Sequence, residues 1–314
     1  MKRYIIYTFL FVAPFIITLY GIEFFLSELP NAYMSKANYL KDNSENVQVL
    51  VLGSSHGITG IDPNSFSKNT FNIANYAQTL DLDYEILNKY QDELGALEYV
   101  IVPLSYHSLW SKLKYHPQTW RLKYYDIYYN ISTEKNPLKR LLFLDHTMQN
   151  DIEILWDYYY KQKNPISDLT LLGLNYLAPT ESLDALTKSS KEIADSHKAA
   201  DLGTLYNENI ECLKKIIEIG KRKNAKIIFV TLPAHPSFIE LLDEKQLNML
   251  YATAKDLEDN KNVFYYNLLC DFSNTKENDN IDLFYDADHL SGKGAGVVGH
   301  KLDSIIKSID NRAQ

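Results

Sequence analysis

Three side chains in this sequence could together activate a nucleophile, although they lie near opposite ends of the chain. Ser55 closes a buried-strand pattern that starts at Val47 and breaks at Gly53. Asp286 and His289 stand just before a predicted helix near the C-terminus. A serine hydroxyl needs an imidazole within roughly 2.6–3.2 Å to accept its proton, and the imidazole needs a carboxylate that fixes its tautomer. The sequence therefore predicts a Ser55–His289–Asp286 triad.

Both segments also have ordinary structural interpretations. Gly-Ser-Ser after a strand is typical of a turn or a helix N-cap, and Ser291 could cap the helix that follows it. Asp288 competes with Asp286 for His289, but the side chain of an immediate neighbour tends to diverge. We interpret His56, beside the nucleophile, as positional rather than catalytic. The triad gains weight because a doubly wound sheet gathers its strand-to-helix turns at one edge.

Strands and helices alternate along the chain in the manner of βαβ units. This pattern predicts an α/β fold in which a parallel sheet forms the middle of three layers. The expected strands cover residues 47–52, 99–103, 226–230 and 263–269, and the expected helices cover about 82–94, 205–223, 238–257 and 294–309. Such a sheet would bring the two predicted catalytic segments to the carboxyl ends of its strands.

The motifs resemble those of the SGNH or GDSL hydrolase superfamily, and within it the membrane-anchored polysaccharide O-acetyltransferase-like members. The first family block, Gly-Asp-Ser, matches Gly-Ser-Ser at 53–55, and the last block, Asp-x-x-His, matches 286–289. The resemblance implies a flavodoxin-like SGNH domain in which Ser55 is the nucleophile. It covers the chain from about residue 47 to residue 306.

The resemblance also implies where the oxyanion would be held. Residues 71–78 are similar to the second block, whose glycine donates a backbone N–H. Ala77 takes that place and keeps the N–H, with less backbone freedom. The third block, Gly-x-Asn-Asp, has no counterpart after the strand at 99–103. Ser105 or His107 is left as a substitute donor, and losing one such donor typically costs ~10²–10³ in rate.

Residues 4–22 contain no charged side chain and predict a membrane anchor. As a helix this stretch is about 28 Å long, close to the ~30 Å hydrocarbon thickness of a bilayer. Lys2 and Arg3 precede it and Glu23 follows it, so the positive-inside bias predicts a cytoplasmic N-terminus and an exported remainder. A cleaved signal peptide is the alternative, but its apolar region is usually shorter and ends in small residues.

We therefore expect a membrane anchor at residues 1–27 and an SGNH-like domain at 28–314, with a helical insertion at about 106–200. The insertion is rich in aromatic side chains: Trp110, Trp120, Trp156, Tyr124, Tyr125, Tyr128, Tyr129 and Tyr158 to Tyr160. We expect it to cap the active-site face. Aromatic faces suit carbohydrate rings, but they also pack protein cores and lie at membrane interfaces. Core packing is the favoured interpretation for any single residue.

The composition limits the partners and cofactors. A net charge of −8 and a pI near 5.5 argue against a nucleic-acid partner. Cys212 and Cys270 lie in apolar patterns, which leaves open both a disulfide and buried free thiols. No His/Cys/carboxylate cluster has zinc-like spacing, so we expect neither metal nor cofactor. We interpret His235 as structural and residues 191–201 as a solvated polar stretch.

The resemblance implies a serine-dependent acyl esterase or O-acetyltransferase that acts on cell-envelope or exported polysaccharide. It would be held at the cell membrane by a single span, with its catalytic domain extracytoplasmic. Transfer requires that a sugar hydroxyl reaches the acyl-enzyme before water, and it implies a polytopic membrane partner that delivers the acyl group. The missing third block motivates a second hypothesis, a catalytically inactive glycan-binding or assembly subunit.

Overall fold

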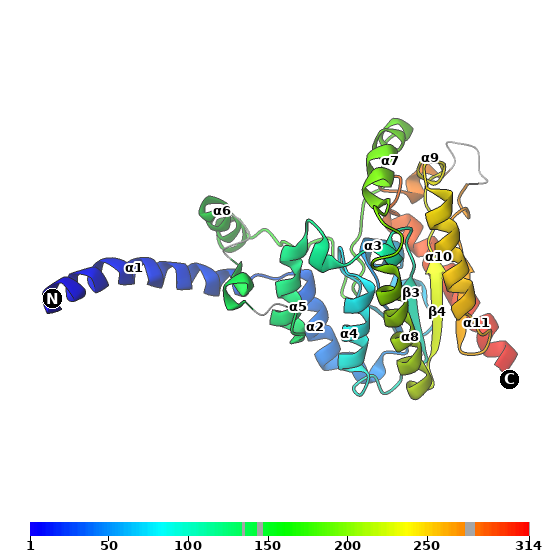
Figure 1. Ribbon diagram of the computed structural model, residues 1–314, viewed down its shortest axis with the longest axis horizontal. Helices are drawn as coiled ribbons and strands as arrows, with labels where there is room; N and C mark the ends of the chain where they lie inside the picture. The colour runs from blue at the N-terminus through cyan, green and yellow to red at the C-terminus, as the bar shows by residue number, and fades with distance from the viewer. Residues whose placement is uncertain (134–135, 143–146, 274–279, 314) are drawn as a thin grey trace. The chain divides into compact units, whose positions relative to one another are not determined.

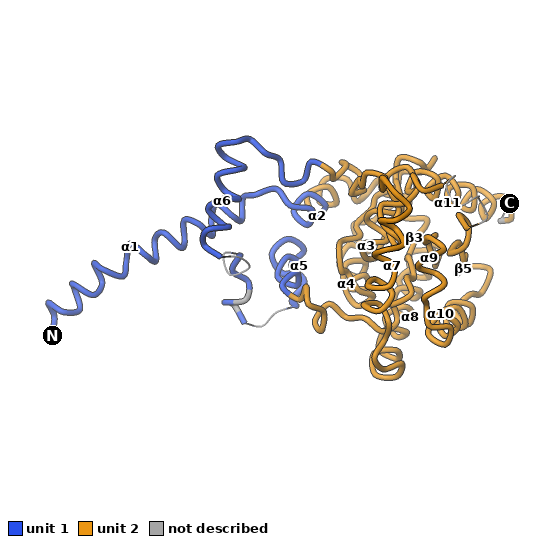
Figure 2. The backbone as a smooth tube through the Cα atoms, turned by 90° about the horizontal axis from the view of Figure 1, so that it is seen from above, with its two compact units in different colours: residues 1–37, 120–167 blue, residues 38–119, 168–314 orange. Residues whose placement is uncertain are grey.

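The computed structural model describes residues 1–133, 136–142, 147–273 and 280–313. The chain divides into two compact units (Figure 2). The first unit contains residues 1–37 and 120–167, and the second contains residues 38–119 and 168–314. Of the expected insertion, residues 120–167 thus group with the N-terminal helices, and the parts on either side of them belong to the second unit.

A five-stranded parallel sheet organises the second unit, and its strand order is β2-β1-β3-β4-β5. The strands are β1 Val49–Val51, β2 Thr70–Asn72, β3 Tyr99–Pro103, β4 Lys226–Thr231 and β5 Val263–Asn267. This is the flavodoxin-like order of a doubly wound sheet, so the predicted fold class is confirmed. The sequence pattern missed β2, because Thr70 and Asn72 interrupt any apolar run there, whereas the equally short β1 lies inside the apolar pattern at 47–52. β2 pairs in parallel with β1, with Val51 opposite Asn72.

Helices cover both faces of this sheet (Figure 1). They are α3 Ser55–Gly60, α4 Leu80–Tyr90, α8 Tyr206–Lys223, α10 Glu244–Leu257 and α11 Gly292–Ala313; α2 Ala32–Asn43 precedes them. Two more helices, α7 Leu183–His197 and α9 Pro236–Ile239, lie beyond the ends of the strands. One face buries Val49, Val51, Ile101, Ile228 and Val230 of the sheet with Val298, Leu302, Ile306 and Ile309 of α11. Side chains alternate along a strand, so the strand residues between those just named point to the opposite face of the sheet, toward α4 and α8. On that face Gly220 of α8 lies directly over Ile227.

The helix predicted over 238–257 is in fact two helices, α9 and α10. Asp243 separates them, because its side chain accepts the backbone N–H of Gln246 at 3.1 Å and so begins α10 as an N-cap. The apolar pattern runs through the break because Phe238 and Leu242 are both buried. The last helix also has a side-chain cap, since Ser291 Oγ accepts the N–H of Gly294 at 3.2 Å.

The first unit consists of α1 Lys2–Ser27, the start of α2, α5 Leu122–Tyr129 and α6 Met148–Tyr159. α1 contains the predicted anchor and is long and apolar enough to cross a membrane. Near it, Tyr33 stacks on Tyr124 with ring centroids 4.9 Å apart. Tyr125 and Tyr129 are fully buried. Core packing is thus confirmed for these tyrosines, whereas Trp156 of α6 is half exposed.

The two cysteines do not form a disulfide. Cys212 is buried on α8, and Cys270 is exposed after β5. Burial raises the pKa of the Cys212 thiol to about 11, so this side chain stays protonated near neutral pH and behaves as a small apolar group.

Candidate active site

The turn that follows β1 places Ser55 at the carboxyl edge of the sheet. Gly53 has a φ of 113°, which L side chains rarely adopt. A Cβ atom there would lie 3.1 Å from Cδ of Pro103, at the end of β3. A glycine therefore lets β1 turn this tightly against its neighbour. Ser55 opens α3 beside the point where the strand order reverses, which is the usual location of ligand sites in such sheets.

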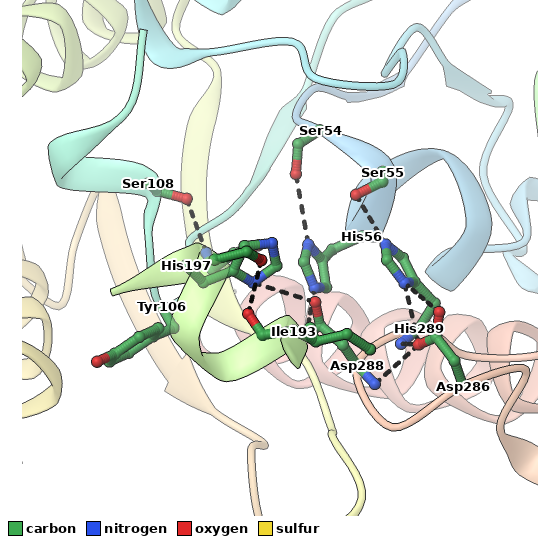
Figure 3. Close-up of polar contacts among 12 residues, drawn as sticks. Ser54, Ser55, His56, Tyr106, Ser108, Ile193, His197, Asp286, Asp288 and His289 are labelled. Carbon is green, nitrogen blue, oxygen red and sulfur yellow. Dashed lines mark hydrogen bonds and ion pairs between the residues drawn. The ribbon is translucent and has the colours of Figure 1, made fainter. Parts of the chain in front are cut away.

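The structure brings the three predicted catalytic side chains into one hydrogen-bonded chain (Figure 3). His289 Nε2 lies 2.8 Å from Ser55 Oγ. His289 Nδ1 lies 3.0 Å from Asp286 Oδ2. Asp286 Oδ1 also accepts the backbone N–H groups of Asp288 at 2.9 Å and His289 at 2.7 Å. The carboxylate is therefore fixed by its own loop, and it holds the imidazole toward the serine.

The charges around these three residues favour an ionised Asp286 and a more basic His289. Burial alone would lower the pKa of His289, but its hydrogen bond to Asp286 and the charges of Asp288 and Asp286 outweigh burial and raise that pKa. Burial would raise the pKa of Asp286, yet the hydrogen bond and charge of His289 and two backbone N–H groups lower it. Asp286 is therefore ionised at neutral pH, and His289 is a stronger base than a free imidazole.

A second set of the same residue types lies next to the triad and consists of Ser54, His56 and Asp288. We call this set the inner array. His56 Nε2 lies 2.7 Å from Asp288 Oδ1, and its Nδ1 lies 3.5 Å from Ser54 Oγ. The rings of His56 and His289 stack with centroids 4.8 Å apart and an interplanar angle of 17°. Asp288 thus diverges from His289, as predicted. Ser54 occupies the N-cap position of α3 but makes no side-chain cap.

Two further histidines, His107 and His197, adjoin the inner array, and no sequence motif connects them with it. His197, at the end of α7, has Nδ1 3.3 Å from Asp288 Oδ2. Its ring centroid lies 4.3 Å from that of His107. Burial lowers the pKa of both histidines, so both are neutral near pH 7. The interpretation of 191–201 as a solvated stretch was wrong for one face of α7, where Ala194 is buried at helical spacing from His197.

The two predicted oxyanion donors occupy different surroundings. Ala77 has a φ of 57° in the turn between Asn75 and Gln78, so it adopts the left-handed backbone that a glycine would take without strain. Asn75 N–H donates to Gly53 O at 3.2 Å, which joins this turn to the nucleophile turn. The N–H of Ser105 donates to Ser108 Oγ at 2.8 Å. Ser105 therefore has only its hydroxyl to offer, and both oxyanion roles stay predictions.

Beneath the turn at Gly53 lies a buried carboxyl group that we did not predict. Asp83 of α4 is buried and accepts the N–H of Gly53 at 2.8 Å and the side-chain amide of Gln78 at 2.7 Å. Burial raises the pKa of Asp83 to about 7, although these two hydrogen bonds oppose the shift. A signal was present in the sequence, since this charged residue falls on the apolar face of the predicted helix, next to Leu82 and one turn from Ile86 and Leu87.

The site also contains side chains of the types that hold metal ions. The ligand atoms of His56, Asp288 and His289 lie within 4.8 Å of one another, and two imidazoles with a carboxylate are common zinc ligands. To bind a cation there, His289 would have to give up a hydrogen bond to Ser55 or Asp286. The arrangement therefore fits proton transfer better than metal binding.

A cavity of about 380 Å³ lies beside the catalytic loop, and its lining includes His235, Ser237, Glu240 and Phe284. His235 N–H donates to Ala287 O at 2.9 Å, and its side chain caps α9 by accepting the N–H of Ser237. The predicted structural role of His235 is therefore seen. The lining does not include the three triad residues.

Comparisons with known proteins give distant likenesses to solved structures. No protein-family model matches the chain, and no curated protein matches it. Among solved structures, the chain is similar to a candidate acylhydrolase from Bacteroides fragilis NCTC 9343, with 11% identity and a TM-score of 0.42 over 88% of this chain and 96% of that one. It is also similar to a GDSL-like lipase from Bacteroides thetaiotaomicron VPI-5482, with 12% identity and a TM-score of 0.40 over 88% and 99%. At these identities and TM-scores, the function has to be derived from the site itself.

Proposed function

We propose that this chain is a serine-dependent acyl esterase or O-acetyltransferase that acts on cell-envelope or exported polysaccharide. The observation that supports this most strongly is the chain of hydrogen bonds from Ser55 Oγ to His289 Nε2 at 2.8 Å and from His289 Nδ1 to Asp286 at 3.0 Å. These are the distances at which an imidazole can take a proton from a serine while a carboxylate orients it.

The proposed reaction has two steps. Ser55 Oγ attacks the acetyl carbonyl carbon while its proton moves to His289 Nε2. The tetrahedral intermediate then collapses, the alcohol leaves with that proton, and acetyl-Ser55 remains. In the second step, water or a sugar hydroxyl gives its proton to His289 and attacks the acetyl carbonyl. Ser55 recovers its proton, and acetate or an acetylated sugar is released.

The oxyanion of each intermediate would be held by the backbone N–H groups of Ser55 and Ala77. The Ser55 N–H is at the start of α3, where the first amides of a helix have no partner within the helix. Ala77 supports the role in another way, since a non-glycine residue with positive φ carries strain of the kind that collects at functional sites.

The setting of this chemistry is also part of the proposal. α1 would anchor the chain as a single span, and Lys2 and Arg3 at its start favour a cytoplasmic N-terminus and an exported catalytic domain. A single span cannot carry an acyl donor across the bilayer. Acetyl transfer would therefore need a polytopic membrane partner that delivers the acyl group.

Ester turnover by the purified full-length chain tests this function. We expect hydrolysis of para-nitrophenyl acetate, and the Ser55→Ala variant should lose at least ~10³-fold in rate, as other serine triads do. Ser54→Ala is the matched control and should stay within about tenfold of the wild type, since this hydroxyl is 3.5 Å from its histidine. Added oligosaccharide would divert the acetyl group from water if the enzyme is a transferase. Equal rates for wild type and Ser55→Ala would favour the inactive glycan-binding or assembly subunit instead.

A further inference from the structure

Helix α6 carries two apolar faces, and one of them is used inside the first unit. Leu155 and Tyr158 pack in a cluster with Leu26 and Leu29, at the end of α1 and just after it. At the border between the two faces, Tyr159 meets Phe25 of α1 edge to face, with ring centroids 5.6 Å apart, and the rest of its ring stays exposed. α6 is thus attached to the last turns of the proposed membrane helix.

The other apolar face of α6 is exposed. Met148, Ile152, Trp156 and Tyr159 follow one another at spacings of four, four and three, which places them on one side of the helix. Each is between 45% and 53% exposed. Tyr160 extends the same surface, since its ring stacks on Trp156 at 4.2 Å. A contiguous apolar stripe of this kind is unusual on a surface that faces only water.

The position of α6 along α1 indicates what covers this stripe. The charge-free stretch of α1 ends at Ile22, and Phe25 lies three residues further on, about 4.5 Å along the axis at ~1.5 Å per residue. If α1 spans a bilayer, the Phe25–Tyr159 contact lies at the boundary between acyl chains and headgroups. Helices that rest in this boundary bury their apolar face by ~5–10 Å.

The composition of α6 also suits such a boundary. Tryptophan and tyrosine are enriched there, because their rings are apolar and their edges polar. Away from the stripe the helix carries polar groups, and Asp157 pairs with Lys161 and Lys163, each at 2.6 Å. The two lysines just after α6 would face the headgroups, while the stripe would face the acyl chains.

We propose that α6 is a membrane-surface helix, whose Met148–Ile152–Trp156–Tyr159 face is embedded in the outer boundary of the bilayer that α1 spans. This rests on the proposed membrane anchor and is independent of the chemistry at Ser55. It gives the chain a second attachment to the membrane, which restricts how the first unit can tilt about its single span.

Tryptophan quenching by brominated lipids tests this surface. The full-length chain is reconstituted in phosphatidylcholine vesicles whose acyl chains carry bromine either near the headgroup or near the bilayer centre. Bromines near the headgroup should quench part of the tryptophan emission of the wild type, and bromines near the bilayer centre should quench less. In Trp156→Phe, most of this quenching should be absent. Because Trp156 is half exposed, this substitution leaves the packed face of α6 intact.

The outcomes separate the two proposals. Unchanged quenching in Trp156→Phe, with protein that stays in the vesicles at alkaline pH, would overturn the surface helix and leave the anchor standing. Trp156 shielded from both lipid bromines and aqueous iodide would show that a protein covers the stripe, which also overturns it. Release of the chain at alkaline pH would refute both the anchor and the surface helix.

Discussion

The triad and the inner array contain the same residue types in adjacent positions, but they differ in the serine–histidine distance and in the exposure of their side chains. In the triad, serine and histidine are 2.8 Å apart, and the side chains of His289 and Asp286 are 18% and 26% exposed. In the inner array the corresponding distance is 3.5 Å, and the side chains of His56 and Asp288 are only 9% and 4% exposed. Residue types alone therefore do not define a nucleophile, since contact distance and access distinguish the two sets.

The inner array instead has the features of a support. The bond between His56 and Asp288 ties α3, which carries Ser55, to the loop that carries His289. The charge of Asp288 also helps to raise the pKa of His289. We therefore propose that the triad carries out the chemistry, and that the inner array aligns it and tunes its electrostatics.

The largest difference is expected between the two aspartates. Asp286→Asn should lower the rate of ester hydrolysis by ~10⁴-fold, because the amide favours the wrong tautomer of His289. Asp288→Asn should lower it by no more than about tenfold, since Asp288 touches His56 rather than His289. Steady-state rates at the pH optimum measure both. Equal losses would mean that the two sets act as one catalytic unit.

A smaller effect is expected on the pH profile. The proposed mechanism needs His289 neutral and Asp286 ionised, so kcat/KM should fall as the pH drops through the pKa of His289, which lies above its ordinary value. Asp288→Asn removes a negative charge that raises this pKa, so the acid limb should move to lower pH. If the acid limb of the kcat/KM profile stays at the same pH or moves to higher pH in Asp288→Asn, Asp288 does not raise the pKa of His289.

The smallest effect concerns folding. His56→Gln should lower the free energy of unfolding by about 1–3 kcal/mol, because it weakens the closest hydrogen bond of the buried Asp288. His300→Gln is a suitable control, since His300 is exposed on α11. Urea unfolding of both variants at neutral pH gives the comparison. A free energy equal to that of the control would refute the supporting role.

The sequence was sufficient to predict the sheet and the meeting of Ser55 with His289. Four of the five strands lie in apolar runs that can be recognised in the sequence, and parallel topology then brings their carboxyl ends to one edge. The contribution of His197 could not be predicted in this way, because it depends on how α7 packs across the site. The same is true of residues 120–167, whose grouping with the N-terminal helices follows from packing.

The position of a fluorophosphonate adduct tests the central claim most directly. The full-length wild type is labelled, digested and examined by mass spectrometry, so that Ser54 and Ser55 are distinguished within one peptide. The account predicts an adduct on Ser55 that persists in Ser54→Ala and disappears in His289→Ala. An adduct on Ser54, or none in the wild type, would contradict it.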